Sequence, residues 1–136
     1  MSSLPNELLR DLYWSFGEPV PTSPQHFIEA AREYAADLDC PDPIEDLQKE
    51  LPFSDVGLRN AHWSQSQSGE WTEEDADLRV LSSGYSKLTG AELLWELHVA
   101  CAATVGECDH RFFEGLRLEA DESSNEPPVY RVVLGS

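Results

Sequence analysis

Four residues in the last third of the chain have side chains of the kinds that bind zinc. They are spaced as His98-x2-Cys101-x6-Cys108-x-His110, which supplies two imidazoles and two potential thiolates. His98 and Cys101 are three positions apart, so a helix would present them on one face. The spacing matches no familiar zinc motif. The alternative is that Cys101 is a small core residue and His98 a hydrogen-bonded core histidine, so a zinc-binding regulatory or enzymatic domain is one of two open interpretations.

Other signatures of catalysis are missing from the sequence. No recognised nucleophile motif surrounds a cysteine or histidine, and no glycine-rich phosphate loop, HExxH, GxSxG or EF-hand spacing occurs. Glu114 falls between Phe112 and Leu116 on one face of a predicted strand, so we expect it to be partly buried and to need a partner, an arginine or His98. We interpret that contact as a structural brace and Gly115 as a bulge or a close approach. The sequence favours a protein without catalysis, metal or cofactor.

A polar segment in the middle of the chain combines two tryptophans with dense negative charge. Aromatic side chains surrounded by charge are typical of tight protein interfaces. The alternative is that both tryptophans fill the core and the acidic residues only face water. We predict a partner-binding site made of these residues, the last two from a second acidic segment: Trp63, Glu70, Trp71, Glu73, Glu74, Asp75, Asp121 and Glu122.

Composition limits the partners that such a site can have. The chain has 136 residues, which suits one domain, residues 1–136, and its 26 acidic against 9 basic residues give a net charge of −17. Nucleic acids and anionic membranes would repel that surface, whereas a basic protein would be attracted. Three cysteines form no disulfide framework, and we see neither a secretory signal nor a membrane-spanning run. We therefore expect a cytoplasmic protein.

The first half of the chain is predicted to be helical. Leu8, Leu9, Leu12, Tyr13 and Phe16 suggest a short amphipathic helix. Ser23-Pro24 and Asp42-Pro43 are helix-start signals for two further helices. Residues 53–76 are predicted to be a long loop, with at most a short strand near position 63. Loops of that length are uncommon in small domains and are often functional.

The second half is predicted to mix strands with a central helix. Thr89 and Glu92 form a capping box at the start of an apolar helix that runs to about Val105. Residues 77–83, 111–120 and 129–134 are predicted strands, the last two forming a hairpin. We therefore expect an α+β fold, in which a small antiparallel sheet packs on the central helix and the N-terminal helices cover the remainder.

Residues 88–136 resemble small bacterial immunity proteins that are encoded beside polymorphic toxins of contact-dependent or type VI secretion systems. The resemblance lies in Glu92-Leu-Leu-Trp-Glu-Leu-His98, Asp109-His110-Arg-Phe-Phe-Glu-Gly-Leu116, Pro128-Val-Tyr130 and the terminal Leu-Gly-Ser136. It implies a non-enzymatic protein that binds a cognate toxin in the cytoplasm and blocks it. Binding surfaces vary within such proteins, so the resemblance transfers no contact residue, and the matching residues are expected to form the scaffold.

These observations predict an immunity protein whose cognate toxin has a basic surface, as a nuclease does. Negative charge would mimic phosphate and speed association with such a toxin. The first alternative is the zinc-binding domain built on His98, Cys101, Cys108 and His110. The second is a general mimic of nucleic acid that inhibits several basic proteins.

Overall fold

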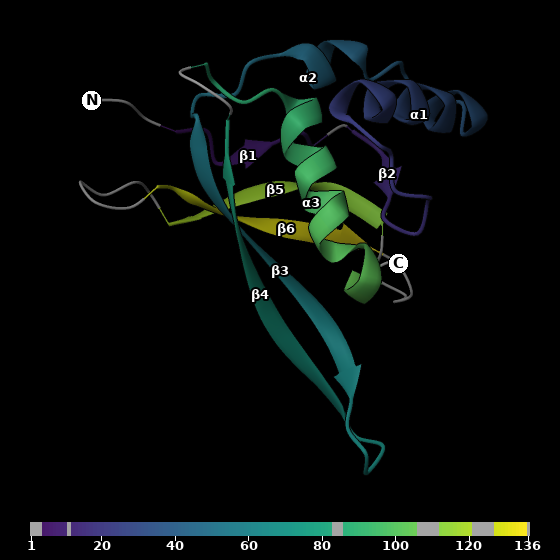
Figure 1. Cartoon of the computed structure of the whole chain (residues 1–136), viewed down its shortest axis with the longest axis vertical. Helices are drawn as coiled ribbons and strands as arrows, with labels where there is room; N and C mark the ends of the chain where they lie inside the picture. The colour runs from purple at the N-terminus through teal and green to yellow at the C-terminus, as the bar shows by residue number, and fades with distance from the viewer. Residues whose placement is uncertain (1–3, 11, 83–85, 106–111, 121–126, 136) are drawn as a thin grey trace.

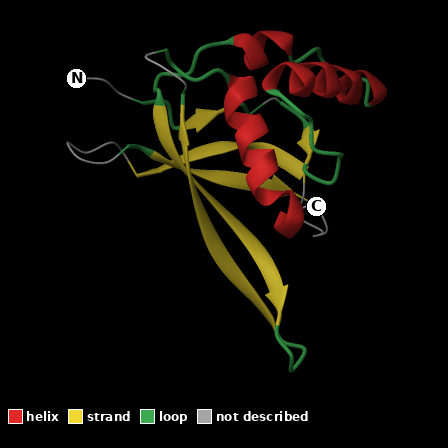
Figure 2. Cartoon of the chain, in the orientation of Figure 1, coloured by secondary structure: helices red, strands yellow, loops and turns green. Residues whose placement is uncertain are grey.

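A mixed β-sheet carries a long apolar helix across one face, and two further helices pack beside that helix (Figure 1). This computed structural model describes residues 4–10, 12–82, 86–105, 112–120 and 127–135, with only the backbone for 61–65, 74–76, 103–105 and 120. Figure 2 shows both kinds of element, and the predicted α+β class is confirmed. The elements are β1 Glu7–Leu8, β2 Trp14–Ser15, α1 Pro24–Asp37, α2 Ile44–Gln48, β3 Asp55–Gln65, β4 Trp71–Leu81, α3 Gly90–Val105, β5 Phe112–Ala120 and β6 Val129–Gly135.

The order of strands in the sheet is β1-β5-β6-β3-β4, and β2 pairs with β5 beside β1. The predicted hairpin is confirmed, because β5 and β6 are antiparallel neighbours. The three predicted strands lie in one sheet as β4, β5 and β6, and β3, which was expected to be a loop, lies between β4 and β6. β3 pairs with β6 in parallel through Gly57, Leu58 and Arg59, so the sheet is mixed and not purely antiparallel.

The central helix α3 begins at the predicted capping box. The Thr89 amide donates to Glu92 Oε1 at 3.2 Å, and the Glu92 amide donates to Thr89 Oγ1 at 3.2 Å. The helix buries Leu93, Leu94 and Leu97 against the sheet residues of the same hydrophobic core, which include Val56, Leu58, Val80, Phe113, Tyr130 and Val132. In the described ranges, no helix combines the length and the hydrophobicity needed to cross a membrane.

The predicted N-terminal helix is wrong. Leu9 has a φ of 54°, in the left-handed region, and the segment forms the short strands β1 and β2 along β5. Leu12, Trp14 and Phe16 are buried, whereas Tyr13 is 49% exposed. Positions 12–14 alternate with the period of a strand, although Ser15 is buried as well. The sequence contained the pattern, but Leu8, Leu9 and Leu12 also fitted a helical spacing.

A bulge in β5 explains a second correction. The register of β5 against β6 shifts between Phe113 and Gly115, so Phe113 and Leu116 are buried while Glu114 is exposed. The expectation of a partly buried Glu114 bracing a helix is therefore wrong. Gly115 has a φ of 124°, and a Cβ there would lie 3.1 Å from the Arg10 Cα. The predicted bulge is confirmed, whereas the expected close approach of a helix is wrong, because the N-terminal segment is the neighbour.

Candidate functional site

A long hairpin replaces the predicted loop. Residues of β3 and β4 pair without interruption from Asp55 with Leu81 to Gln65 with Trp71, so the expectation of an irregular segment over 53–76 is wrong. The turn is closed by the Ser66 amide, which donates to the Glu70 carbonyl at 2.8 Å, and Gly69 adopts a φ of 88°. A three-residue loop with a left-handed glycine is a common hairpin connection.

The distal half of this hairpin extends beyond the rest of the molecule. Figure 1 shows β3 and β4 running away from the helices toward the turn. β6 pairs with β3 only at Gly57, Leu58 and Arg59, so the hairpin is a two-stranded ribbon beyond that point. We call residues 60–76 the arm. Six residues per strand give the paired part a length of roughly 20 Å.

The arm brings together the six central residues of the predicted partner-binding site. Trp71 begins β4 and is 62% exposed, and Glu70 and Glu73 are exposed beside it. The register pairs Trp63 with Glu73. Directly opposed and alternate positions of an antiparallel pair share a face, so positions 63, 65, 71 and 73 lie on one face of the ribbon. The set is Trp63, Glu70, Trp71, Glu73, Glu74 and Asp75, whereas Asp121 and Glu122 lie outside the described residues.

The charge of the arm is of one sign. No lysine or arginine occurs between Arg59 and Arg79, while four acidic residues lie between positions 70 and 75. Like charges on neighbouring positions of a ribbon repel each other and destabilise it slightly. A two-stranded ribbon without packing is itself marginally stable. The arm therefore carries four acidic residues without a lysine or arginine among them, and an exposed indole, at a cost in stability.

The proximal half of the same hairpin neutralises its charges internally. Arg59 Nε donates to Asp77 Oδ1 at 2.9 Å and Arg59 Nη1 to Glu119 Oε1 at 2.7 Å, and Arg131 Nε donates to Glu119 Oε2 at 2.9 Å. These ion pairs join β4, β3, β5 and β6 on the sheet face opposite the buried Leu58. The arginines lower the pKa of Asp77 and of Glu119 below their ordinary values. We call these residues the ion-pair network; its role is structural.

The zinc candidates lie partly in the core. The Trp14 indole N–H donates to His98 Nδ1 at 3.2 Å. A neutral imidazole that accepts at Nδ1 carries its proton on Nε2, so neither nitrogen keeps a lone pair for a metal. Burial raises the pKa of the Cys101 thiol to about 12, which disfavours the thiolate that zinc requires. Cys108 and His110 lie outside the described residues, so the zinc alternative remains a prediction.

His98 also carries an unsatisfied polar atom. Burial lowers its pKa below the ordinary value, and the backbone at Phe16 and Glu18 offsets this only in part. Within the described residues no group meets its buried Nε2 with hydrogen-bond geometry. Aromatic rings surround the imidazole, with Phe16 at a centroid distance of 5.4 Å and Trp14 at 5.7 Å. The arrangement is that of a core histidine that holds the N-terminal segment against α3.

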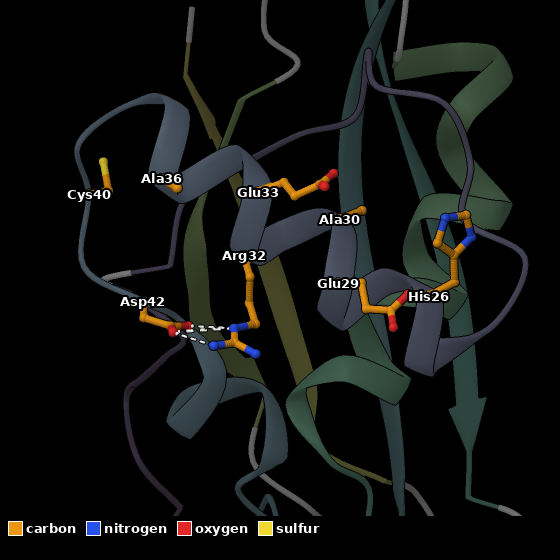
Figure 3. Close-up of a pocket in the computed structure, with 8 residues that line it drawn as sticks. All are labelled: His26, Glu29, Ala30, Arg32, Glu33, Ala36, Cys40 and Asp42. Atoms are coloured by element: carbon orange, nitrogen blue, oxygen red, sulfur yellow. Dashed lines mark hydrogen bonds and ion pairs between the residues drawn. The ribbon is translucent and has the colours of Figure 1, made fainter.

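An open groove lies along α1 (Figure 3). Arg32 and Asp42 form a bidentate ion pair in it, with Nη2 and Oδ2 2.9 Å apart. His26 Nδ1 accepts from the Thr22 amide, and Cys40 Sγ donates to the Leu38 carbonyl. Figure 3 shows His26 and Cys40 at opposite ends of the groove. The groove therefore contains no nucleophile beside a base.

Comparison with known proteins adds no family to this picture. No protein-family model matches the chain, and searches of curated proteins and of solved structures found no match. The strongest candidate site is the arm, identified by its exposed tryptophan, its projection and its charge.

Proposed function

We propose that this protein is an immunity protein, which binds a cognate secreted toxin with a basic surface and neutralises it in the cytoplasm without catalysis. The observation that carries the proposal is the arm. The arm places Trp71, which is 62% exposed, on a projecting ribbon. Its acidic residues lie in a stretch of sequence, between Arg59 and Arg79, that contains no lysine or arginine. The resemblance of residues 88–136 to immunity proteins supports the same function.

The physical argument concerns both rate and affinity. A ribbon of one charge sign attracts an oppositely charged partner over several ångströms and raises the association rate. Tryptophan is enriched among the residues that dominate binding energy, because its large apolar surface is removed from water on contact. A projecting ribbon can also enter a concave active site, as a toxin that acts on nucleic acid would have. Stoichiometric occupation of that site would stop the toxin.

The test begins with affinity capture. The tagged protein would be incubated with lysate of the source organism, washed at moderate and at high salt, and the bound proteins identified by mass. We expect one partner at equal stoichiometry that survives high salt, and loss of that partner's toxic activity when the two proteins are mixed one to one. A purified partner whose activity is unchanged at saturating protein would contradict the proposal.

A matched pair of variants locates the site. Trp71→Ala with Glu73→Gln should weaken neutralisation at least tenfold, because it removes the exposed indole and one charge. The control is Glu29→Gln with Glu33→Gln on α1, which removes two exposed charges from another surface. Equal loss in both variants would indicate a net-charge effect and would remove the arm from the site. Binding to many unrelated basic proteins would favour the general mimic of nucleic acid.

A further inference from the structure

The outer edge of β4 is the longest sheet edge of the arm and has no neighbouring strand. β4 is the last strand in the sheet order, and in the described ranges only β3 pairs with it. It is eleven residues long. An exposed edge of this length presents a row of backbone groups that can pair with a strand from another chain.

Two hydrogen bonds determine which backbone groups face outward. The Ser66 amide donates to the Glu70 carbonyl at 2.8 Å, and the Ser82 amide donates to the Ser54 carbonyl at 2.9 Å. Pairs in an antiparallel ladder alternate between bonded and non-bonded. Even-numbered residues of β4 therefore bond to β3, and the amides and carbonyls of residues 71, 73, 75, 77, 79 and 81 point away from it.

The same positions carry the acidic residues of one face. Glu73, Asp75 and Asp77 are alternate residues, so their positions share a face of the ribbon. Asp77 is already paired with Arg59, which leaves positions 73 and 75 for the cations of a partner. A strand added to this edge would place its own alternate residues directly opposite them. Lysine or arginine at those positions would form cross-strand ion pairs while the two backbones exchanged hydrogen bonds.

We infer that the outer edge of β4 accepts a basic β-strand of the partner protein, with lysine or arginine at alternate positions opposite Glu73 and Asp75. This inference rests on the proposed function and specifies how the partner is bound. A second copy of the chain is the wrong occupant. Antiparallel pairing of β4 with itself, centred anywhere from position 73 to 77, places acidic residues opposite each other, which is destabilising.

The first test uses a probe and the intact protein. The probe is a ten-residue peptide of alternating lysine and threonine, blocked at both ends. Its control has the same sequence and charge but carries N-methyl groups on its four central amides, which cannot donate. We expect the control to bind at least tenfold more weakly in titrations at about 0.15 M salt. Equal affinity of the two peptides would overturn the inference, because charge alone would then explain binding.

Amide hydrogen exchange gives a readout that charge attraction would not produce. With the peptide bound, exchange at residues 73, 75 and 77 should slow at least tenfold, and exchange at residues 72, 74 and 76 should change much less. Uniform slowing, or none, would overturn strand addition. Protection of the odd-numbered amides that rises with protein concentration, without peptide, would identify a second copy as the occupant and would equally overturn the inference.

A pair of substitutions separates the backbone from the side chain. Glu73→Thr and Glu73→Pro both remove the carboxylate, but only proline removes the outward amide and leaves the bonds to β3 in place. We expect Glu73→Pro to bind the peptide at least tenfold more weakly than Glu73→Thr. Retained protection of the Thr72 and Ala76 amides would show that the arm stays folded. If it unfolds, the N-methylated peptide still decides the question.

The outcomes for the inference and for the proposed function are distinct. A toxin that is neutralised equally by the wild type and by Glu73→Pro, without odd-numbered protection, would overturn strand addition and leave the immunity function standing. Odd-numbered protection by the peptide, combined with a captured partner whose activity is unaffected, would support the strand-accepting edge and contradict the immunity function.

Discussion

The two halves of the β3–β4 hairpin share one backbone ladder but differ in what their side chains contact. In the proximal half, Val56 and Leu58 are buried against the core on one face, while Arg59 joins Asp77 and Glu119 on the other. In the arm, the described side chains from Ser66 to Glu73 are all exposed, and the acidic residues have no cation nearby in the sequence. The ion pairs of the proximal half join its strands to one another, whereas the acidic residues of the arm have no lysine or arginine beside them in the sequence.

The two halves also contribute differently to the stability of the hairpin. The proximal half combines buried apolar surface with cross-strand ion pairs, and both hold the sheet together. The arm is held by its backbone ladder and its turn, and a two-stranded ribbon of this kind is marginally stable in water. The arm therefore gains more from a bound partner than the proximal half does, because added contacts would order it.

The largest expected effect is on the free energy of unfolding, when a core side chain of the proximal half is truncated. Leu58→Ala should lower the free energy of unfolding by about 2–5 kcal/mol, because it leaves a cavity beneath the sheet. Trp71→Ala in the arm should change it by less than about 0.5 kcal/mol, as exposed substitutions usually do. Urea unfolding of both variants measures the difference. A comparable loss of stability in both variants would show that the arm is packed as tightly as the proximal half.

Charge reversal in the arm should weaken partner binding next most strongly. Glu73→Lys with Glu74→Lys is expected to reduce the affinity for the captured partner about 10- to 100-fold at low salt, mainly through the association rate. The salt dependence of binding should also decrease. Glu29→Lys with Glu33→Lys on α1 is the control of equal charge. Stopped-flow association at several salt concentrations checks both effects, and unchanged affinity and salt dependence would exclude the arm from the interface.

Acid should release the ion-pair network of the proximal half. The pKa values of Asp77 and Glu119 are lower in the folded protein than their ordinary values of 3.8 and 4.5. Between the folded and the ordinary pKa values the unfolded chain binds more protons than the folded protein does. The stabilisation by the ion-pair network is therefore complete above about pH 4.5 and is lost as the pH falls through the folded pKa values. We expect Arg59→Gln to lower the urea midpoint at pH 7 and to differ little from wild type at pH 2.

Two features make that measurement specific to the network. The effect at pH 7 should be small, because exposed ion pairs contribute little individually. Lys87→Gln, which removes an exposed residue's charge outside the sheet, is the control for net charge. A constant difference between Arg59→Gln and wild type from pH 7 to pH 2 would mean that Arg59 stabilises the sheet through packing and not through charge.

The smallest expected effect is on the stability of the arm, when an arginine is introduced into it. The register pairs Ala61 with Asp75 in the same way that it pairs Arg59 with Asp77. Ala61→Arg should therefore stabilise the arm by about 0.2–1 kcal/mol and weaken binding of the basic partner. Amide exchange at Thr72 and Ala76 measures the first effect and titration the second. Tighter binding of the basic partner would contradict the division between the two halves.

Local signals in the sequence predicted α1, α2, α3 and one hairpin, but they also predicted a helix near the N-terminus where β1 and β2 form. The Ser23 hydroxyl accepts from the His26 amide at 3.1 Å, and Thr89 and Glu92 cap α3, as their spacing predicted. These bonds join residues close in the chain, so the sequence alone specifies them. The β5–β6 hairpin was predictable as well, because its strands alternate around a short acidic connection.

The sequence alone also determined the charge and the aromatic content of the arm, on which the proposed class of partner rests. Only the tertiary structure decided that this segment is a paired ribbon and that β3 separates β4 from β6. The physical reason is that apolar residues alternate only where a strand meets a core, as Val56 and Leu58 do. Beyond Arg59 the side chains that the structure describes are exposed, apart from the buried Asn60, so the pairing and the open edge arise from backbone bonds that leave no hydrophobic pattern in the sequence.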